Sequence, residues 1–158
     1  MKPINTLDQA TRQQVYDVIE QNAGIHLRGI CHLLNRQMGV IQYHVYVLES
    51  ANLIHSIKDG RYKRFFITTR PLSLERQTIL SLLQRKTTAK VIHLLVQHNG
   101  NGISRGLIAQ ELNFTIQAIT WHLQKLMDAN VISLLKTNGK NYYHITPTFL
   151  PMIESYEK

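Results

Sequence analysis

The sequence contains few of the features that build cross-linked, secreted or membrane-spanning proteins. Its 158 residues include a single cysteine, Cys31, so no internal disulfide can form. No apolar run approaches the length of a membrane span, and the amino terminus lacks the apolar core of a signal peptide. Only four prolines and eight glycines are present, which argues against a disordered or low-complexity chain. From these absences we expect a soluble, ordered, cytoplasmic protein.

Motifs for catalysis and metal binding are also lacking. The chain has no glycine-rich phosphate loop and no nucleophile elbow, and its ten carboxylates do not pair on one apolar face. The eight histidines and Cys31 form neither a paired-thiol motif nor an H-E-x-x-H motif of the kind that zinc sites show. We therefore expect no enzymatic activity, no cofactor and no metal, and we expect Cys31 to fill a small apolar site.

What the sequence does contain is an excess of positive charge. It holds 18 Lys and Arg against 10 Asp and Glu, which is a formal net charge of +8. Residues 1–70 contain nine basic and five acidic residues, and residues 71–158 contain nine and five again, so each half carries +4. Long-range electrostatics then favour a polyanion, most often nucleic acid, as the partner.

The chain consists of two copies of one unit. Residues 43–54 return in pattern as residues 121–132, at an offset of 78 residues. Three apolar positions upstream, 25, 30 and 34, recur at the same offset as 103, 108 and 112. Further upstream, positions 15, 18 and 19 match positions 91, 94 and 95 if a two-residue insertion within residues 99–102 is allowed. Self-similarity at a fixed offset indicates a repeated supersecondary unit.

Each unit shows the pattern of three helices followed by a hairpin. Apolar spacings of three and four residues predict first helices around residues 15–19 and 91–95, and second helices over residues 27–34 and 105–112. Asn35 and Asn113 occupy tight turns before third helices over residues 38–51 and 116–129. Strands follow at residues 53–58 and 62–68, and at 131–137 and 141–146, around Asp59-Gly60 and Asn138-Gly139. This element order is that of a winged helix.

The expected fold is mainly α, of the α+β class, with two tandem winged helix-turn-helix domains joined by a helical linker. We place the first domain at residues 8–70, the linker at 71–87, the second domain at 88–147 and a C-terminal helix at 148–158. Apolar stripes mark the linker and the last helix: Ile79, Leu82 and Leu83, and Phe149, Ile153 and Tyr156. These stripes are candidates for packing the two units together or for forming a homodimer.

The third helix of each unit is the candidate recognition helix. A projection at 100° per residue gives each helix an apolar face: Ile41, Val45 and Leu48, and Ile119, Leu123 and Leu126. The opposite faces carry groups suited to base edges in a major groove: Gly39, Gln42, Tyr43 and Tyr46, and Gln117, Thr120, Trp121 and Gln124. The alternative interpretation is a polar face that only contacts solvent. Ser104 and Thr115 are the expected N-caps of the second and third helices in the second unit.

The hairpins are basic. The expected phosphate-binding residues are Lys58, Arg61, Lys63 and Arg64 on the first wing, Lys136 and Lys140 on the second, and Arg36 before the first recognition helix. Phosphate contacts supply much of the affinity of DNA-binding proteins, and a wing can reach the backbone beside the recognition helix. We expect the first wing to bind more strongly. His44 and His122 occupy equivalent positions of the repeat, which suggests a shared packing or hydrogen-bonding role near the hairpin.

At this point the chain resembles a known family, the ArsR/MarR-like regulators with two winged helices that occur in archaea and some bacteria. The resemblance covers nearly the whole chain, and the residues that carry it are 24–30, Gln42-Tyr43-His44 with Leu48-Glu49, 59–66, 119–123 with Leu126, and Asn138-Gly139. It implies sequence-specific binding to double-stranded DNA and control of transcription. Two positions of the first recognition helix differ from the family pattern: Gln37 stands where a Ser or Thr usually caps the helix, and Val40 replaces the more usual Thr. The thiolate metal-binding motif of the ArsR proteins is also missing.

Other functions are compatible with the same fold. Winged helices also serve as protein-interaction scaffolds in assembly complexes or as components of the transcription machinery, without contact to specific bases. Such a scaffold needs no cationic wings, so the charges within residues 58–64 favour DNA. A regulator switched by a small ligand between the units is a third interpretation.

Overall fold

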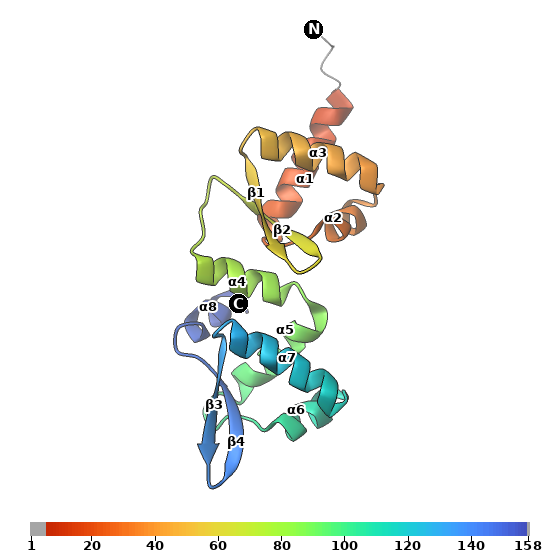
Figure 1. Ribbon diagram of the computed structural model, residues 1–158. Coiled ribbons are helices and arrows are strands. Elements are labelled where there is room, and N and C mark those ends of the chain that lie inside the picture. The colour runs from red at the N-terminus through yellow and green to blue at the C-terminus, as the bar shows by residue number, and fades with distance from the viewer. Residues whose placement is uncertain (1–5, 158) are drawn as a thin grey trace. The chain divides into compact units, whose positions relative to one another are not determined.

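Two units with the same order of elements follow one another along the chain (Figure 1). The structure is a computed structural model that describes residues 6–157. The first unit comprises residues 1–73 and the second residues 74–158. Three helices and a hairpin recur in each, so the repeat in the sequence is also a repeat of the fold.

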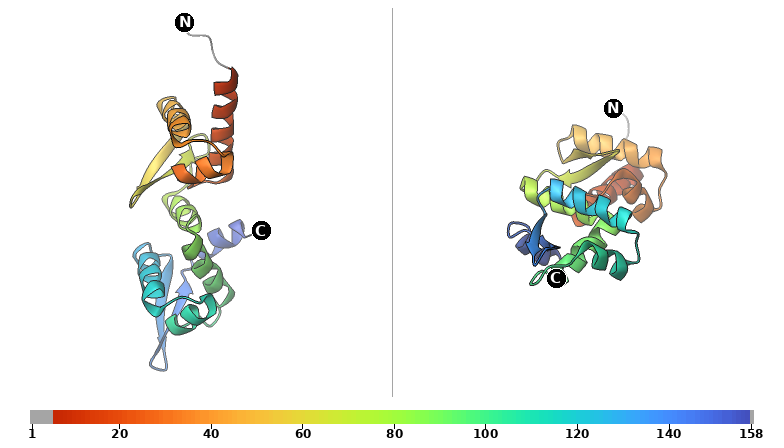
Figure 2. Two further views of the ribbon diagram at one scale, coloured as in Figure 1. Left: turned by 90° about the vertical axis from the view of Figure 1, so that its right-hand side faces the viewer. Right: turned by 60° about the horizontal axis from the view of Figure 1, so that its bottom comes forward.

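The first unit contains α1 (Thr6–Gln21), α2 (Leu27–Leu34), α3 (Met38–Ser50), β1 (Ile54–Asp59) and β2 (Tyr62–Ile67). The two strands are antiparallel, with Ile54 opposite Ile67. An isolated bridge between Ile25 and Phe65 joins the loop before α2 to the hairpin. Figures 1 and 2 show this hairpin projecting beside the three helices as a wing.

The second unit repeats this arrangement and adds a helix at each end. Its elements are α4 (Leu74–Leu83), α5 (Lys86–Gln97), α6 (Arg105–Leu112), α7 (Ile116–Asp128), β3 (Ile132–Thr137), β4 (Lys140–Ile145) and α8 (Leu150–Tyr156). The hairpin is again antiparallel, and Ile103 bridges to Tyr143 as Ile25 does to Phe65. The bounds of α2 and α6 agree with the sequence prediction, while α3 and α7 end one residue earlier.

Asparagines in the left-handed conformation direct the chain at equivalent points of both units. Asn35 and Asn113 have φ of 50° and 57° and end α2 and α6, as expected. Asn52 and Asn130, with φ of 56° and 58°, lie between each third helix and the following strand. Asparagine tolerates this conformation better than most residues with a Cβ, so these positions place the turns.

The first hairpin turns one residue later than its sequence suggested. Asp59 is the last residue of β1, and Gly60, with φ of 61°, forms the two-residue loop with Arg61. The Asn138-Gly139 loop of the second hairpin lies where it was expected, with both residues at positive φ. Asp59 stays in the ladder, where its carboxylate forms an ion pair with Arg64.

Each unit has its own apolar core, which includes the inner face of its third helix. The core of the first unit contains Val15, Ile19, Ile25, Ile30, Ile41, Val45, Leu48, Ile54, Phe65 and Ile67. The equivalent residues of α7, Ile119, Leu123 and Leu126, are at most 2% exposed in the core of the second unit. The inward faces predicted for both third helices are therefore the buried ones.

The segment expected to be a linker contributes to the core of the second unit. Residues 71–87 contain α4 and the start of α5, and Ile79 of α4 is completely buried in that core. Leu82 and Leu83 pack against the same core. The sequence showed the apolar stripe of α4 but not its partner, because a stripe does not specify which apolar surface covers it.

The C-terminal helix packs into the same unit. Phe149, just before α8, and Ile153 within it are buried with Ile79 in one core. A guanidinium nitrogen of Arg76 on α4 donates a hydrogen bond to the hydroxyl of Tyr156 on α8 at 3.2 Å. The stripes that suggested packing between units or a homodimer are thus covered in large part within the second unit.

Truncating Ile79 tests the place of α4. Trp121 is the only tryptophan in the sequence, so its fluorescence reports unfolding of the second unit. Ile79→Ala should lower the free energy of unfolding measured this way by about 2–5 kcal/mol, because it opens a cavity in a packed core. Leu74→Ala is the control: its side chain is 72% exposed, and the change should stay within about 0.5 kcal/mol. An α4 that served only as a tether would leave the fluorescence transition unchanged in both variants.

Candidate nucleic-acid interface

The two candidate recognition helices begin differently. The hydroxyl of Thr115 accepts a hydrogen bond from the amide of Ala118 at 3.2 Å and caps α7, as expected. Gln37 precedes α3 and makes no such side-chain bond. A side-chain cap contributes about 0.5–2 kcal/mol to a helix, so the first turn of α7 is held more firmly by local interactions than that of α3.

The second helices are capped in both units, but by different residues. Ser104 caps α6 by accepting a hydrogen bond from the amide of Leu107 at 3.3 Å, as expected. In the first unit, Nδ1 of His26 accepts from the amide of Gly29 at 3.0 Å. Histidine is not a preferred N-cap residue, so sequence reasoning did not find this cap.

All eight residues predicted to contact bases lie on exposed positions of α3 and α7. On α3 these are Gly39, Gln42, Tyr43 and Tyr46, and on α7 Gln117, Thr120, Trp121 and Gln124. The rings of Tyr46 and Trp121 are 68% and 51% exposed, which is high for side chains of their size. A Cβ added to Gly39 would meet no atom within 4 Å, so the backbone there is open to close approach. Contact of these residues with bases stays a prediction.

Polar groups on the outer face of α7 already have partners. The hydroxyl of Thr120 donates to the carbonyl of Ile116 at 2.7 Å and accepts from Arg105 of α6 at 3.4 Å. The amide nitrogen of Gln124 donates to a carboxylate oxygen of Asp128 at 2.8 Å. These bonds reduce what Thr120 and Gln124 can offer a base, and they bring Arg105, which the sequence analysis did not single out, onto this face.

On each third helix, one exposed aromatic ring has a cation beside it. The guanidinium carbon of Arg12 on α1 lies 5.8 Å from the ring centroid of Tyr43, and Nζ of Lys125 lies 5.4 Å from that of Trp121. Cation–π contacts at these distances hold rings and cations together. The four-residue spacing of Trp121 and Lys125 is a signal that sequence reasoning missed. Arg12 and Tyr43 lie on different helices, so no local spacing predicts their contact.

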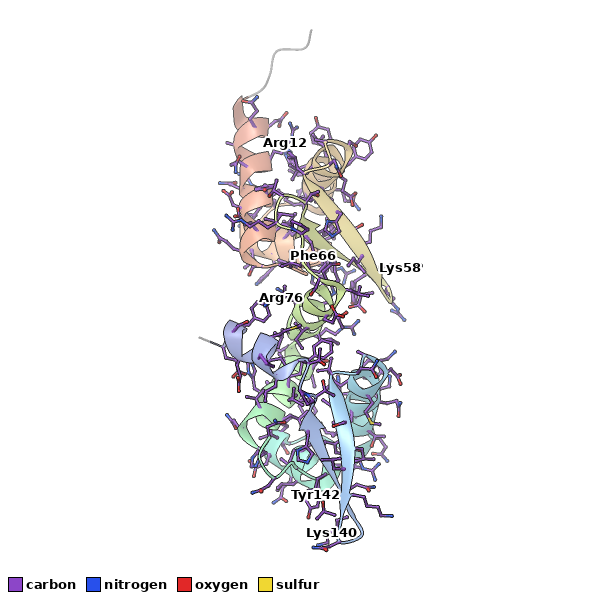
Figure 3. All side chains as sticks on the ribbon, turned by 90° about the vertical axis from the view of Figure 1, so that its left-hand side faces the viewer. Arg12, Lys58, Phe66, Arg76, Lys140 and Tyr142 are labelled. Atoms are coloured by element: carbon purple, nitrogen blue, oxygen red, sulfur yellow. The ribbon has the colours of Figure 1, made fainter. Side chains whose placement is uncertain are left out.

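The first wing concentrates three exposed cations at its end. Lys58 stands directly opposite Lys63 in the β1–β2 ladder, and Arg61 lies in the turn beside them. Figure 3 shows Lys58 near the tip of this hairpin. Within residues 6–157 none of the three forms an ion pair with a carboxylate, and like charges directly opposite one another destabilise a hairpin. Arg36, between α2 and α3, is also exposed.

Arg64 does not fit the phosphate contact expected of it. Its side chain is buried, with Nε 3.1 Å from a carboxylate oxygen of Asp59 and a terminal nitrogen donating to the carbonyl of Gly24 at 3.3 Å. Its guanidinium carbon also lies 5.7 Å from the ring centroid of Tyr62. A buried charge requires partners of this kind, so Arg64 connects the hairpin to the loop before α2 and is not part of the exposed charge of the wing.

The second wing is less basic and more apolar. Lys136 and Lys140 are exposed, and Figure 3 shows Lys140 at the end of this hairpin. Lys136 faces Asn141 and Lys140 faces Thr137, so no cation of this ladder stands directly opposite another. Leu134 and Leu135 of β3 are 39% and 52% exposed. The two wings therefore present different surfaces on the same backbone arrangement.

The equivalent histidines differ in their partners, and the hydrogen-bond partner of His122 lies on the first helix of its unit and not on the hairpin. Nδ1 of His122 lies 3.3 Å from the hydroxyl of Thr88 on α5. His44 is buried, its Nδ1 has no hydrogen-bond partner among the described residues, and Arg12 stands where α5 has Thr88. Burial lowers the pKa of His44, with a further lowering by Arg12 against a smaller rise from Asp8. Burial and then Arg85 lower the pKa of His122.

Cys31 and the remaining histidines show no ligand cluster in the described part of the chain. Cys31 packs against the core of the first unit, and burial raises the pKa of its thiol. Residues 6–157 contain no group of three or more His, Cys, Asp or Glu side chains that could hold a metal ion. None of the helices in that range has both the length and the apolar character needed to cross a membrane.

Acid should destabilise the protein through these two histidines. The unfolded chain protonates histidine near pH 6.5, whereas the folded chain keeps His44 and His122 neutral to lower pH. The unfolded state therefore binds more protons as the pH falls below about 6.5, and stability present above that pH is progressively lost. His44→Gln should flatten the decline of the unfolding free energy between pH 7 and 5, by at most about 1.4 kcal/mol per pH unit. The exposed His32→Gln control should keep the wild-type slope, and equal slopes in all three proteins would contradict the assignment.

Comparisons with known proteins agree on two helix-turn-helix domains. A family described as an N-terminal HTH domain matches residues 9–79, and one described as winged helix-turn-helix DNA-binding matches residues 85–133. An uncharacterized HTH-type transcriptional regulator of Methanocaldococcus jannaschii is 26% identical over 153 residues. The match covers 93% of this chain and 38% of the relative, so the chain spans about two-fifths of that protein's length.

Solved structures are similar at a low level. The DNA complex of FabT from Streptococcus pneumoniae has a TM-score of 0.35 and 16% identity, with 80% of this chain and 78% of that chain covered. The endosomal complex ESCRT-II has a TM-score of 0.36 and 12% identity, with 91% and 63% covered. Likenesses this weak do not separate DNA binding from protein assembly.

The domain type follows from the repeat, the geometry of both units and the two matched families. Each unit has a left-handed turn between its second and third helices, an exposed third-helix face and a hairpin wing. The ArsR/MarR-like subtype stays a resemblance. The chain therefore consists of two helix-turn-helix domains in tandem, each with the element order of a winged helix.

Proposed function

We propose that the chain binds double-stranded DNA in a sequence-specific way and regulates transcription. In this proposal α3 and α7 enter the major groove and the wings contact the phosphate backbone. A regulator of this kind works where the chromosome is, which in a cell without a nucleus is the cytoplasm. No cofactor is required, and the partner is a DNA duplex.

The observation that carries this proposal is the pair of lysines across the first hairpin. Lys58 and Lys63 are direct cross-strand neighbours with Arg61 in the turn, and all three are exposed. The one carboxylate of this hairpin, Asp59, is engaged by the buried Arg64. Placing like charges opposite one another costs hairpin stability, and a polyanion would offset that cost. The charge of +4 in each half of the sequence supports the same partner.

The exposed faces of α3 and α7 support base contacts. Gln42 and Gln117 each present a side-chain amide on these faces, and an amide can donate to and accept from adenine in a bidentate pair. Neither amide has a hydrogen-bond partner elsewhere in the described chain, in contrast to Gln124, which donates to Asp128. We therefore place the main base contacts of the amides at Gln42 and Gln117.

A protein-interaction role is the second candidate function. The observation that favours it is the exposure of Leu134 and Leu135, which lie on opposite faces of the second wing, since exposed apolar side chains on a hairpin can contact a partner protein. In that case one unit would bind DNA and the other a protein.

A homodimer is a further proposal, although α4 and α8 have buried much of their apolar surface within the second unit.

Removing the exposed charges of the first wing should weaken binding to all duplexes alike. The double variant Arg61→Ala, Lys63→Ala should lower the slope of log affinity against log salt by about one unit for each lost phosphate contact. Arg70→Ala is a control of the same charge type, because Arg70 is exposed, pairs with Glu20 and lies beyond the end of β2. A salt slope that stays at the wild-type value in the double variant would remove this wing from the interface.

Truncating the amides should change sequence preference. In selection from a random duplex pool, Gln42→Ala and Gln117→Ala should each relax the enriched motif at its own position, with a loss of about 1–3 kcal/mol on the preferred site. Binding to unrelated duplexes should change little, because phosphate contacts remain. If both variants select the wild-type motif with wild-type affinity, the amides make no base contacts.

The length of the selected motif distinguishes the remaining alternatives. Two unlike half-sites bound by a monomer indicate that both units engage one duplex. A single half-site bound by a monomer assigns the other unit to a protein partner. A longer palindrome bound by a protein of twice the monomer mass indicates a homodimer. The absence of any enriched motif would contradict sequence-specific binding and leave the scaffold function.

A further inference from the structure

Arg105 of the second unit lies beside the candidate recognition helix without belonging to it. It is the first residue of α6, directly after the Ser104 cap, and its side chain is exposed. A terminal guanidinium nitrogen donates a hydrogen bond to the hydroxyl of Thr120 on α7 at 3.4 Å. The bond joins two helices through residues fifteen positions apart and brings a cation to the outer face of α7.

Thr120 can accept this bond only in a defined orientation. Its hydroxyl proton is directed to the carbonyl of Ile116, 2.7 Å away, so the lone pairs are the part of the hydroxyl that remains for other groups. A hydroxyl has one proton to donate and two lone pairs to accept with. One lone pair receives the Arg105 guanidinium, which restricts where its plane can lie. Thr120 is thereby a positioning group for Arg105 and a weak partner for a base.

Most of the guanidinium remains available to a ligand. An arginine carries five N–H donors in a planar fork, and the contact with Thr120 is the one hydrogen bond that this side chain makes within residues 6–157. No carboxylate in that range lies within ion-pair distance of it. The two-pronged edge of a guanidinium matches the O6 and N7 acceptors of guanine in the major groove, whereas a lysine offers only a point charge.

The surroundings favour a base over a phosphate as the ligand. Gln117, Thr120 and Gln124 share the face of α7 that also carries Trp121, and the Arg105 guanidinium bonds to Thr120 at one side of that face, next to the side chains that would meet base edges. Exposed lysines suited to phosphate are already present in this unit, at Lys136 and Lys140 on the wing and at Lys125 in the last turn of α7.

The first unit lacks this hydrogen bond between its second and third helices at the equivalent positions. At the repeat offset of 78 residues, Arg105 corresponds to Leu27 and Thr120 to Gln42. Leucine has no donor, so α2 and α3 cannot form the same bond. Arg28, the next residue of α2, is exposed, and within residues 6–157 its side chain forms no hydrogen bond to α3. The Arg105–Thr120 hydrogen bond therefore distinguishes the second unit from the first.

We propose that Arg105 is a specificity-determining residue that contacts one guanine in the half-site of the second unit, with Thr120 holding its guanidinium in place. This inference rests on the proposed function, because it requires α7 to lie in a major groove. It adds a base contact from α6, outside the recognition helix, and it predicts a guanine that the first half-site does not need.

The test uses the full chain and four variants, with selection from a random duplex pool and affinities over a range of salt concentrations. Arg105→Ala removes the donors, so one guanine should disappear from the enriched motif, and discrimination against adenine at that position should fall from roughly 5- to 150-fold to near unity. Arg105→Lys keeps the charge but removes the planar fork, so it should weaken this discrimination and leave the salt slope unchanged. Thr120→Val should weaken that discrimination while leaving the charge in place.

Controls separate this result from loss of structure or of charge. Arg28→Ala removes an exposed arginine from the equivalent helix of the first unit and should keep the guanine in the motif. Trp121 fluorescence should show wild-type unfolding for the Arg105 variants, since that side chain is exposed. If Arg105→Ala retains the guanine, or if it weakens all duplexes equally and lowers the salt slope by about one, Arg105 does not contact that guanine, and this inference is overturned while the proposed function stands. A wild-type chain that enriches no motif would overturn the proposed function and this inference together.

Discussion

The burial of one face of each third helix is the constraint on which the rest of the structure depends. In α7, Ile119, Leu123 and Leu126 are at most 2% exposed. Moving one of these side chains into water would cost the fold about 1.5–3 kcal/mol of free energy. Rotating the helix about its axis by one residue would expose part of this face. Burial therefore decides which side chains face outward, and the asparagine turn before the helix decides where that face begins.

The two units share this frame but differ in surface chemistry. Core positions repeat with the same or similar residues, as Ile30 and Ile108 do, because the packing that they serve is the same in both units. Surface positions differ: Arg12, Leu27, Gln42 and Lys63 of the first unit correspond to Thr88, Arg105, Thr120 and Asn141 of the second. The first unit consequently offers more exposed charge on its wing, and the second offers more ordered hydrogen-bonding groups on its third helix. Two such units suit a binding site with two unlike halves.

Arg64 and the buried histidines show how the same residue types serve either surface or interior. Arg64 belongs by sequence to a run of wing cations, yet Asp59 and the carbonyl of Gly24 bind it inside the first unit. Burial lowers the pKa of His44 and of the partly buried His122, which favours their neutral forms. A formal count of charges therefore overstates what the first wing presents to a polyanion, and the exposed cations carry the electrostatic part of the proposed function.

The sequence by itself determined the features that depend on neighbouring residues. The repeat, the bounds of α2 and α6, the caps at Ser104 and Thr115 and the inward faces of α3 and α7 all follow from local spacing and local hydrogen bonds. The outward position of the eight candidate base-contacting residues follows from the same periodicity.

Tertiary structure alone decided the features that depend on residues far apart in the chain. It packed α4 into the core of the second unit, buried Arg64, brought Arg12 to the ring of Tyr43 and joined Arg105 to Thr120. Spacing along one helix or strand tells which side chains share a face, but it does not tell which face of another element meets them. Which faces meet is decided only when the helices and hairpins pack, because the apolar cores then fix the positions of the polar groups around them.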